Sequence, residues 1–375
     1  MSANKLVAQF RDPEAARALA EAIRARSTRP IRLMEFCGGH THAILRYGIP
    51  SLLPETIDLR SGPGCPVCVT SAADLDLAIA LAQVPGAILT TFGDMVRVPG
   101  SRDSLAKAKA EGADVRVVYS PLDALRVARE NPGRPVIFLG VGFETTAPMV
   151  ASAVLAAEAE GVENFYVFST HKLTPPATRA ILDAGEVALD GIIGPGHVTT
   201  VIGAEAWRFL PDEYTIPVAI AGFEPLDILR AVLALVEMVE EGRPDVSNVY
   251  ARSVRPEGNP AARRTMDQVF EVADAEWRGF GTVPASGLRL REAYARFDAA
   301  RAFPMEVGPA REPPGCRCGD ILRGVLRPPD CPLFARACTP QTPIGPCMVS
   351  AEGACAAYYR YGNVARRTAH VARRT

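Results

Sequence analysis

The chain is organised around the stretch Ser61-Gly-Pro-Gly-Cys-Pro-Val-Cys-Val69. Its Gly62-Pro-Gly64 segment predicts a turn in which the backbone can approach another group closely. Cys65 and Cys68 follow with two residues between them, the spacing of a redox-active dithiol or of half a metal site. A structural zinc site needs two more ligands at normal spacing, and none follows nearby. The spacing therefore favours a dithiol or an iron site.

A second cysteine-bearing segment, Cys37-Gly-Gly-His-Thr-His42, directly follows the apolar run Ile31–Phe36. Cys37 should then lie where a strand ends and a helix begins, which is the ligand-binding edge of an open α/β sheet. A helix N-terminus and the imidazoles of His40 and His42 should favour the thiolate of Cys37 over its thiol. We expect Cys37 to be a nucleophile or an iron ligand; the alternative is a small buried side chain at a tight turn. His40 and His42 would take part in the chemistry of this site, orient Cys37 without binding the ligand, or cap the helix.

The composition is that of a globular protein with a large core. The chain has 375 residues, 48% of them apolar, and a net charge of −1, which is enough for two or three domains. The balanced charge excludes the basic surface of a nucleic-acid-binding protein. Charged residues interrupt the apolar runs well before ~20 residues, so we expect no membrane span.

The compartment follows from the N-terminus and the cysteines. Residues 13–26 predict an amphipathic helix instead of an apolar signal core, which favours the cytoplasm. Nine cysteines there should be reduced, metal-bound or catalytic, because static disulfides are rare in reducing compartments.

Short apolar runs alternate with helical patterns, which predicts parallel βαβ units. We expect strands at Ile31–Phe36, Thr56–Leu59, Ala87–Thr91, Val115–Tyr119, Val136–Val141, Phe165–Ser169, Gly191–Ile193 and Val218–Ala221. The turn Asn131-Pro-Gly133 interrupts the alternation. The predicted fold class is α/β, with two tandem Rossmann-like parallel-sheet domains of related architecture at residues 1–131 and 132–245.

The alternation stops after Gly242, and residues 246–375 predict a helical and irregular C-terminal domain. Helices are expected at Met266–Trp277 and Leu290–Ala302. The proline- and cysteine-rich segment Pro309–Cys355 cannot build a regular sheet, so we expect a metal cluster to order it. The basic tail from Val364 to Thr375 should be solvated.

Six cysteines lie in this C-terminal segment. Cys318, Cys331, Cys338 and Cys355 form the pattern Cys-x12-Cys-x6-Cys-x16-Cys, with Cys316 and Cys347 in addition. Four thiolates suit zinc or a [4Fe–4S] cluster. The closely paired cysteines of structural zinc sites are missing, which favours iron–sulfur. Spacing alone leaves open which four of the six bind.

Acidic residues stand at the ends of three predicted strands: Asp94, Glu144 and Glu224. They would orient ligands or protonate cyanide-like groups at a cleft, or else act as caps near helix N-termini.

With these segments in place, the chain resembles the HypD family of hydrogenase maturation factors. The matching motifs span nearly the whole chain: Phe36-Cys-Gly-Gly-His-Thr-His-Ala-Ile44, Ser61–Val69, Thr91-Phe-Gly-Asp-Met95, Val98-Pro-Gly-Ser101, Gly142-Phe-Glu-Thr-Thr-Ala-Pro148, Gly194-Pro-Gly-His197, Ala221-Gly-Phe-Glu-Pro-Leu-Asp-Ile228, Gly345-Pro-Cys-Met-Val-Ser350 and Glu352-Gly-Ala-Cys355.

The resemblance implies a scaffold that builds the Fe(CN)2CO part of the [NiFe]-hydrogenase active site. It implies a small HypC-type chaperone as partner, and a HypE-type cyanide donor that works with HypF. Cys37 would be an iron ligand shared with the chaperone, beside the redox-active thiols Cys65 and Cys68. A [4Fe–4S] cluster would be bound by Cys318, Cys331, Cys338 and Cys355.

One alternative function remains open from the residues themselves. In an iron–sulfur disulfide oxidoreductase, the cluster would feed electrons to Cys65 and Cys68 for a protein substrate. That function gives the segment Cys37–His42 no role. Whether a scaffold that also moves electrons counts as an enzyme is partly a matter of definition.

Overall fold

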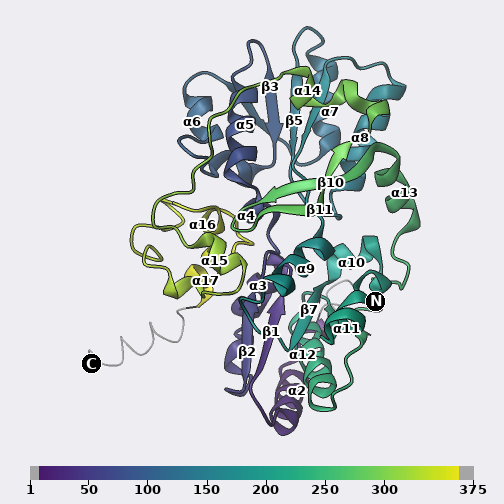
Figure 1. The fold of residues 1–375 in the computed structure, drawn as a ribbon, viewed down its shortest axis with the longest axis vertical. Coiled ribbons are helices and arrows are strands. Elements are labelled where there is room, and N and C mark those ends of the chain that lie inside the picture. Colours follow the sequence, from purple (N-terminus) through teal and green to yellow (C-terminus); the bar gives the residue numbers. More distant parts are fainter. Residues whose placement is uncertain (1–7, 363–375) are drawn as a thin grey trace.

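The computed structural model describes residues 8–362 and contains two parallel β-sheets with helices around them (Figure 1). The first sheet has the strand order β2-β1-β7-β8-β9, and the second has the order β4-β3-β5-β6. The predicted α/β class, with two Rossmann-like parallel-sheet domains and a cysteine-rich C-terminal region, is confirmed.

All eight predicted strands are present, and their ends differ from the predicted ends by at most two residues. Their cores are nearly continuous apolar runs because both faces of a parallel sheet are buried. The first sheet contains β1 (Ile31–Glu35), β2 (Ile57–Ser61), β7 (Gly191–Pro195), β8 (Val218–Ala221) and β9 (Val246–Asn248). The second contains β3 (Ile88–Thr91), β4 (Asp114–Val117), β5 (Val136–Gly140) and β6 (Phe165–Ser169).

Helices connect the strands, and several begin at recognisable caps. The Asp12 side chain accepts hydrogen bonds from the first turn of α2 (Pro13–Arg26), and Ser71 does the same for α5 (Ala72–Ala82). The first sheet also carries α3 (Gly38–Arg46), η1 (Ile49–Ser51), α10 (Gly196–Ile202), η3 (Ala204–Trp207), α11 (Phe209–Tyr214) and α12 (Pro225–Glu240). The second carries η2 (Gly93–Arg97), α6 (Leu105–Ala110), α7 (Pro121–Glu130) and α8 (Ala147–Ala159).

The chain passes from the first sheet to the second after β2 and returns after β6. The first passage runs through α4 (Pro66–Val69), a single helical turn inside the stretch Ser61–Val69, and the return runs through α9 (Thr174–Ala184). The stretch Ser61–Val69 therefore lies at the junction of the two sheets.

This path corrects the predicted domain boundaries 1–131, 132–245 and 246–375. β3 pairs with β5 across residue 131, and β1 pairs with β7, more than a hundred residues away. β9, at Val246–Asn248, closes the first sheet beyond the second predicted boundary. An apolar run predicts that a strand forms, but its partner is chosen by packing between distant segments.

Residues 270–290 form an antiparallel hairpin of β10 (Phe270–Trp277) and β11 (Gly281–Leu290), which lies between the two sheets (Figure 1). The helix predicted at Met266–Trp277 is therefore wrong after Val269, whereas the region predicted as helix at Leu290–Ala302 is helical over η4 and α14. The Ala- and Glu-rich sequence of β10 favours a helix locally, but tertiary pairing overrides this propensity. Three short helices flank the hairpin: α13 (Pro260–Val269), η4 (Glu292–Phe297) and α14 (Ala299–Ala302).

The cysteine-rich segment has little regular structure and lies beside the junction (Figure 1). Its short helices are α15 (Cys318–Leu322), η5 (Pro328–Asp330), α16 (Pro346–Val349) and α17 (Ala354–Tyr361). α16 packs against α4, and α17 packs against α3. The predicted basic tail, Val364–Thr375, lies outside the described residues. Among residues 8–362, no helix is both long enough and apolar enough to cross a bilayer.

Candidate functional site

Cys37 lies at the carboxyl end of β1 and is the N-cap of α3, as the sequence predicted. The glycine turn lies directly against it: Gly38 N–H donates to Gly64 O at 2.8 Å, and Gly62 N–H donates to Glu35 O at 2.8 Å. A Cβ on Gly64 would come within 2.2 Å of Cys37 N. The close backbone approach predicted for Gly62-Pro-Gly64 is therefore the approach to Cys37.

Cys65 and Cys68 are joined by a disulfide across α4. Cys65 is the N-cap of this turn, and its sulfur accepts the Cys68 N–H at 3.2 Å. Both residues are buried, with 3% and 0% of their surface exposed. The disulfide follows immediately after the glycine turn that contacts Cys37, so the fold brings the first two cysteine-bearing segments together.

The protonation of Cys37 differs from the sequence prediction. Burial raises the pKa of its thiol to about 12, and the nearby carboxylates of Glu352 and Glu35 act in the same direction. The N–H groups of Gly39 and His40 lower the pKa, as expected of a helix N-terminus, but they are outweighed. Cys37 is therefore a thiol at neutral pH unless a cation binds to it.

His40 is buried and neutral, so it does not provide the positive charge expected beside Cys37. Burial lowers its pKa to about 4. Its Nε2 donates to Gly222 O at 3.0 Å, while its Nδ1 has no hydrogen-bond partner among the described residues. The ring stacks on Phe223 at 4.6 Å, and Phe223 stacks on His197 at 3.8 Å. His40 thus links α3 to the end of β8.

His42 connects the same helix to the C-terminal segment. Its Nδ1 lies 3.4 Å from Ala351 O, and its ring meets Tyr361 edge-on at 5.1 Å. His40 therefore packs α3 against the end of β8, and His42 packs the same helix against the C-terminal segment. Both contacts help to fix the helix whose N-cap is Cys37.

Glu352 is a residue of this site that the sequence analysis did not assign. A Cβ on Gly38 would come within 2.5 Å of Glu352 O, so the C-terminal segment lies directly on the start of α3. Burial raises the pKa of Glu352, and the charge of Asp94 raises it further. Asp94 comes from η2, at the edge of the second sheet. Both sheets and the C-terminal segment therefore meet around Cys37; the only sequence signal for Glu352 was its motif with Cys355.

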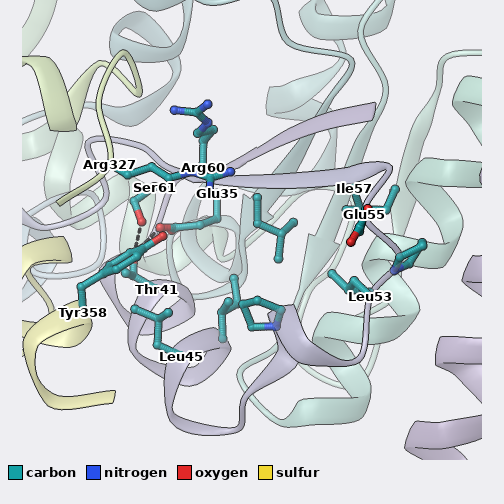
Figure 2. Close-up of a pocket in the computed structure, with 14 residues that line it drawn as sticks. Glu35, Thr41, Leu45, Leu53, Glu55, Ile57, Arg60, Ser61, Arg327 and Tyr358 are labelled. Carbon is teal, nitrogen blue, oxygen red and sulfur yellow. Dashed lines mark hydrogen bonds between the residues drawn. The ribbon is translucent and has the colours of Figure 1, made fainter. Parts of the chain in front are cut away.

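Glu35, the last residue of β1, is a second residue of this site that the sequence did not reveal. Its carboxylate accepts the Cys37 N–H at 2.8 Å and the hydroxyl of Thr41, and burial raises its pKa to about 8. It forms the polar end of a cavity of about 340 Å³ between α3, β2 and the C-terminal segment (Figure 2). The polar lining near Glu35 also includes Ser61 and Tyr358, and the other end is lined by Leu53, Ile57 and the side chain of Glu55 (Figure 2).

Two of the three strand-end acids act as helix caps. Glu144 accepts the Thr174 N–H at 2.8 Å at the start of α9, and Glu224 is the N-cap of α12 and pairs with Arg11. Asp94 instead lies close enough to Glu352 for its charge to raise the pKa of that carboxyl. The capping alternative therefore holds for Glu144 and Glu224.

All six C-terminal cysteines line one small cavity. The four predicted ligands Cys318, Cys331, Cys338 and Cys355 are joined there by Cys316 and Cys347. Cys347 is fully buried, and hydrogen bonds with Cys318 and Cys355, together with burial, raise the pKa of its thiol. Cys347 is thus as central to the cavity as the four predicted ligands.

The donor set of this cavity fits an iron–sulfur group. Its lining consists of cysteine sulfur and apolar side chains such as Ile321, Phe334 and Met348. Within residues 8–362, no three His, Cys, Asp or Glu side chains are already arranged to hold a metal ion.

Comparison with known proteins identifies the family. A family model named HypD and described as "Hydrogenase formation hypA family" matches residues 14–362. The Azotobacter vinelandii protein named hydrogenase maturation factor HypD is 52% identical, covering 98% of this chain and 100% of that protein. Hydrogenase maturation factor HypD2 of Bradyrhizobium diazoefficiens is 51% identical, over 96% of this chain and 97% of that protein.

A more distant relative matches over a similar length. Hydrogenase maturation factor HypD of Escherichia coli is 45% identical, over 95% of this chain and 98% of that protein. The range matched by the family model includes Cys37, the stretch Ser61–Val69 and the six C-terminal cysteines. The chain therefore belongs to the HypD family of hydrogenase maturation factors.

Proposed function

We propose that this protein is a cytoplasmic scaffold on which the Fe(CN)2CO part of a [NiFe]-hydrogenase active site is assembled. The observation that carries the proposal is the convergence of Cys37, the Cys65–Cys68 disulfide and the six-cysteine cavity at one junction. Cys37, which would be a single soft ligand, lies against the glycine turn that leads into the disulfide, and α16 of the six-cysteine segment packs against the disulfide turn α4.

In this proposal iron is the cargo, and Cys37 is its ligand from this chain. Cyanide and CO are strong-field ligands that favour low-spin iron, and thiolate sulfur is a suitable soft donor for that ion. Because the Cys37 thiol is protonated beforehand, iron binding would displace its proton. One thiolate leaves most of the coordination sphere free for cyanide, CO and a cysteine from a HypC-type chaperone.

The Cys65–Cys68 pair would exchange electrons. Its reduction takes two electrons and two protons and breaks the S–S bond to give two thiols. A [4Fe–4S] cluster held by Cys318, Cys331, Cys338 and Cys355 would supply single electrons at low potential. The packing of α16, which contains Cys347, against α4, which contains Cys68, supports electron transfer over a short distance.

The partners should approach at the open edge of the second sheet. Four large apolar side chains are exposed at the carboxyl ends of β4 and β5 or in the first turns of the helices that follow: Val117, Tyr119, Leu122 and Met149. Exposed apolar groups of this kind are typical of a protein-binding surface. We propose this surface for the HypC-type chaperone; a HypE-type cyanide donor, charged by HypF, would then reach the iron at Cys37.

The second candidate, a disulfide oxidoreductase acting on a protein substrate, is less well supported. Exchange with another protein's disulfide requires an accessible attacking sulfur. Cys65 and Cys68 are both almost completely buried. The burial favours electron exchange within this protein and with its bound cargo.

Infrared spectroscopy of the anaerobically purified complex with the chaperone tests the scaffold proposal. The wild-type complex should show CN and CO stretching bands, and Cys37→Ala should lose them while keeping the visible absorption of the cluster. Cys68→Ala should keep bound iron but accumulate fewer of the diatomic ligands. Full CN and CO bands in Cys37→Ala would show that Cys37 is only a packing residue.

A further inference from the structure

The proposed function gives no role to the cavity between α3, β2 and the C-terminal segment. Its volume of about 340 Å³ falls within the range of small-molecule binding sites, roughly 300–1,000 Å³. Its walls come from three parts of the chain: α3, the segment from η1 to the end of β2, and the C-terminal segment with Arg327 and Tyr358. The two ends of this cavity differ in their chemistry (Figure 2).

One end carries a cluster with more positive than negative charge. Three guanidinium groups share the single carboxylate of Asp58: those of Arg32, Arg60 and Arg327. Arg60 and Arg327 line the cavity. Arg327 uses only Nη2 in its pair with Asp58, and its Nε and Nη1 have no hydrogen-bond partner among residues 8–362. Because free guanidinium N–H groups bind carboxylate and phosphate oxygens strongly, this end suits an anionic group.

The same end offers a free hydroxyl group. Tyr358, from α17, lines the cavity, and its hydroxyl makes no hydrogen bond with another described side chain. Burial raises the pKa of this hydroxyl, and the charges of Arg327 and Arg60 oppose the rise, so both guanidinium groups lie near it. Glu35, by contrast, already accepts two hydrogen bonds within the wall, one of them from the Cys37 N–H at 2.8 Å. Tyr358 is therefore available to a ligand, and Glu35 connects the wall to Cys37.

The other end favours an apolar group and disfavours a second negative charge. Leu53 and Ile57 lie there, and a methylene chain packed against them would be removed from water (Figure 2). Glu55 lies at the same end and is exposed, so its carboxylate would repel a negatively charged group placed beside it. The cavity therefore distinguishes a molecule charged at one end from a molecule charged at both ends.

We propose that this cavity binds a small organic anion with one charged head and a short apolar body. The head, a carboxylate or a phosphate ester, lies between Arg327 and Tyr358, and the body extends toward Leu53. Because Glu35 lines the cavity and also accepts the Cys37 N–H, one residue separates the bound anion from Cys37. The site does not depend on iron chemistry at Cys37.

Ligand-observed NMR titration of the full-length protein with simple probes tests this site. Hexanoate and hexyl phosphate carry the proposed head and body, hexanamide lacks the charge, acetate lacks the body, and adipate has a second carboxylate. The tighter of the first two should bind with a dissociation constant on the order of 1 mM, as expected for so small a ligand, and it identifies the head group. Hexanamide, acetate and adipate should each bind about tenfold more weakly than hexanoate.

Two single substitutions connect the affinity to the cavity. Arg327→Gln removes one guanidinium but leaves Asp58 with its two other partners, and Tyr358→Phe removes only the hydroxyl. Arg327→Gln should weaken binding of the tighter probe about tenfold and Tyr358→Phe about threefold, with little change in urea denaturation. Arg301→Gln is the matched control and should bind like wild type. Arg301 also pairs with a carboxylate, and its side chain is 48% exposed, close to the 47% of Arg327.

Two results overturn the inference. If neither hexanoate nor hexyl phosphate binds at about 10 mM, the cavity is not a site for such an anion. If the tighter probe binds equally well to wild type, Arg327→Gln and Tyr358→Phe, it binds elsewhere on the protein. The infrared bands of the complex with the chaperone test the proposed function separately, so either conclusion can fail without the other.

Discussion

The surroundings of Cys37 and the six-cysteine cavity hold sulfur in different ways. Cys37 is fixed by backbone hydrogen bonds from a glycine turn, and the acidic residues Glu352 and Glu35 lie close enough to raise the pKa of its thiol. The cavity is lined by six cysteines and by apolar residues. A single rigid thiol among acids suits a metal that arrives and leaves, whereas a pocket of several thiols suits a resident group.

The largest expected effect comes from the turn that holds Cys37. Gly64→Ala places a Cβ against the backbone of Cys37, which cannot move without displacing β1 or α3. We expect a loss of roughly 3 kcal/mol or more in the free energy of unfolding, measured by urea denaturation. Gly133→Ala is the control, because nothing lies within 4 Å of its Cβ. Equal stability of the two variants would contradict the close approach.

The second-largest expected effect distinguishes the role of the six-cysteine cavity from the role of Cys37. Cys338→Ala should abolish the iron–sulfur absorption and reduce iron and sulfide from roughly four each per chain. It should also loosen the segment from Pro309 to Cys355, which has little other order. Cys37→Ala should leave this absorption unchanged. Zinc in place of iron, without charge-transfer absorption, would contradict the cluster assignment.

A smaller, pH-dependent effect is expected from Glu35. Its pKa is raised from 4.5 to about 8, so between these values the folded protein binds a proton that the unfolded chain has lost. This contribution to stability is complete below about pH 4.5 and decreases as pH rises to about 8, by about 1.4 kcal/mol per pH unit. Glu35→Gln should lack this slope in metal-free protein.

Denaturation at pH 5, 6, 7 and 8 measures the difference. Glu55→Gln serves as the control, because Glu55 lines the same cavity but is exposed. If Glu35→Gln and wild type lost stability in parallel from pH 5 to pH 8, the carboxyl of Glu35 would not be protonated in the folded protein.

The smallest effect on stability is expected at the exposed apolar surface of the second sheet. Tyr119 is 92% exposed, so Tyr119→Ala should change the free energy of unfolding by less than about 0.5 kcal/mol. Its affinity for the HypC-type chaperone should nevertheless fall by roughly tenfold, as for an aromatic anchor of an interface. Calorimetry checks both quantities. Val272→Ala, exposed on the hairpin, should bind the chaperone like wild type.

Much of the fold and part of the site could be predicted from local sequence. The eight strands follow from short apolar runs, because a strand buried on both faces needs apolar residues at every position. The position of Cys37 follows from the change of pattern at Phe36, and the glycine turn predicted a close backbone contact. These features depend on neighbouring residues, so the sequence by itself determined them.

Tertiary structure alone decided which segments meet. The partners of β1 and β3, the β10–β11 hairpin, and the position of Glu352 depend on contacts between residues far apart in the chain. The protonation of Cys37 was mispredicted for the same reason. The local sequence predicts the helix N-terminus, which lowers the pKa of the Cys37 thiol. The burial that raises this pKa and outweighs the helix arises only from tertiary packing around the thiol.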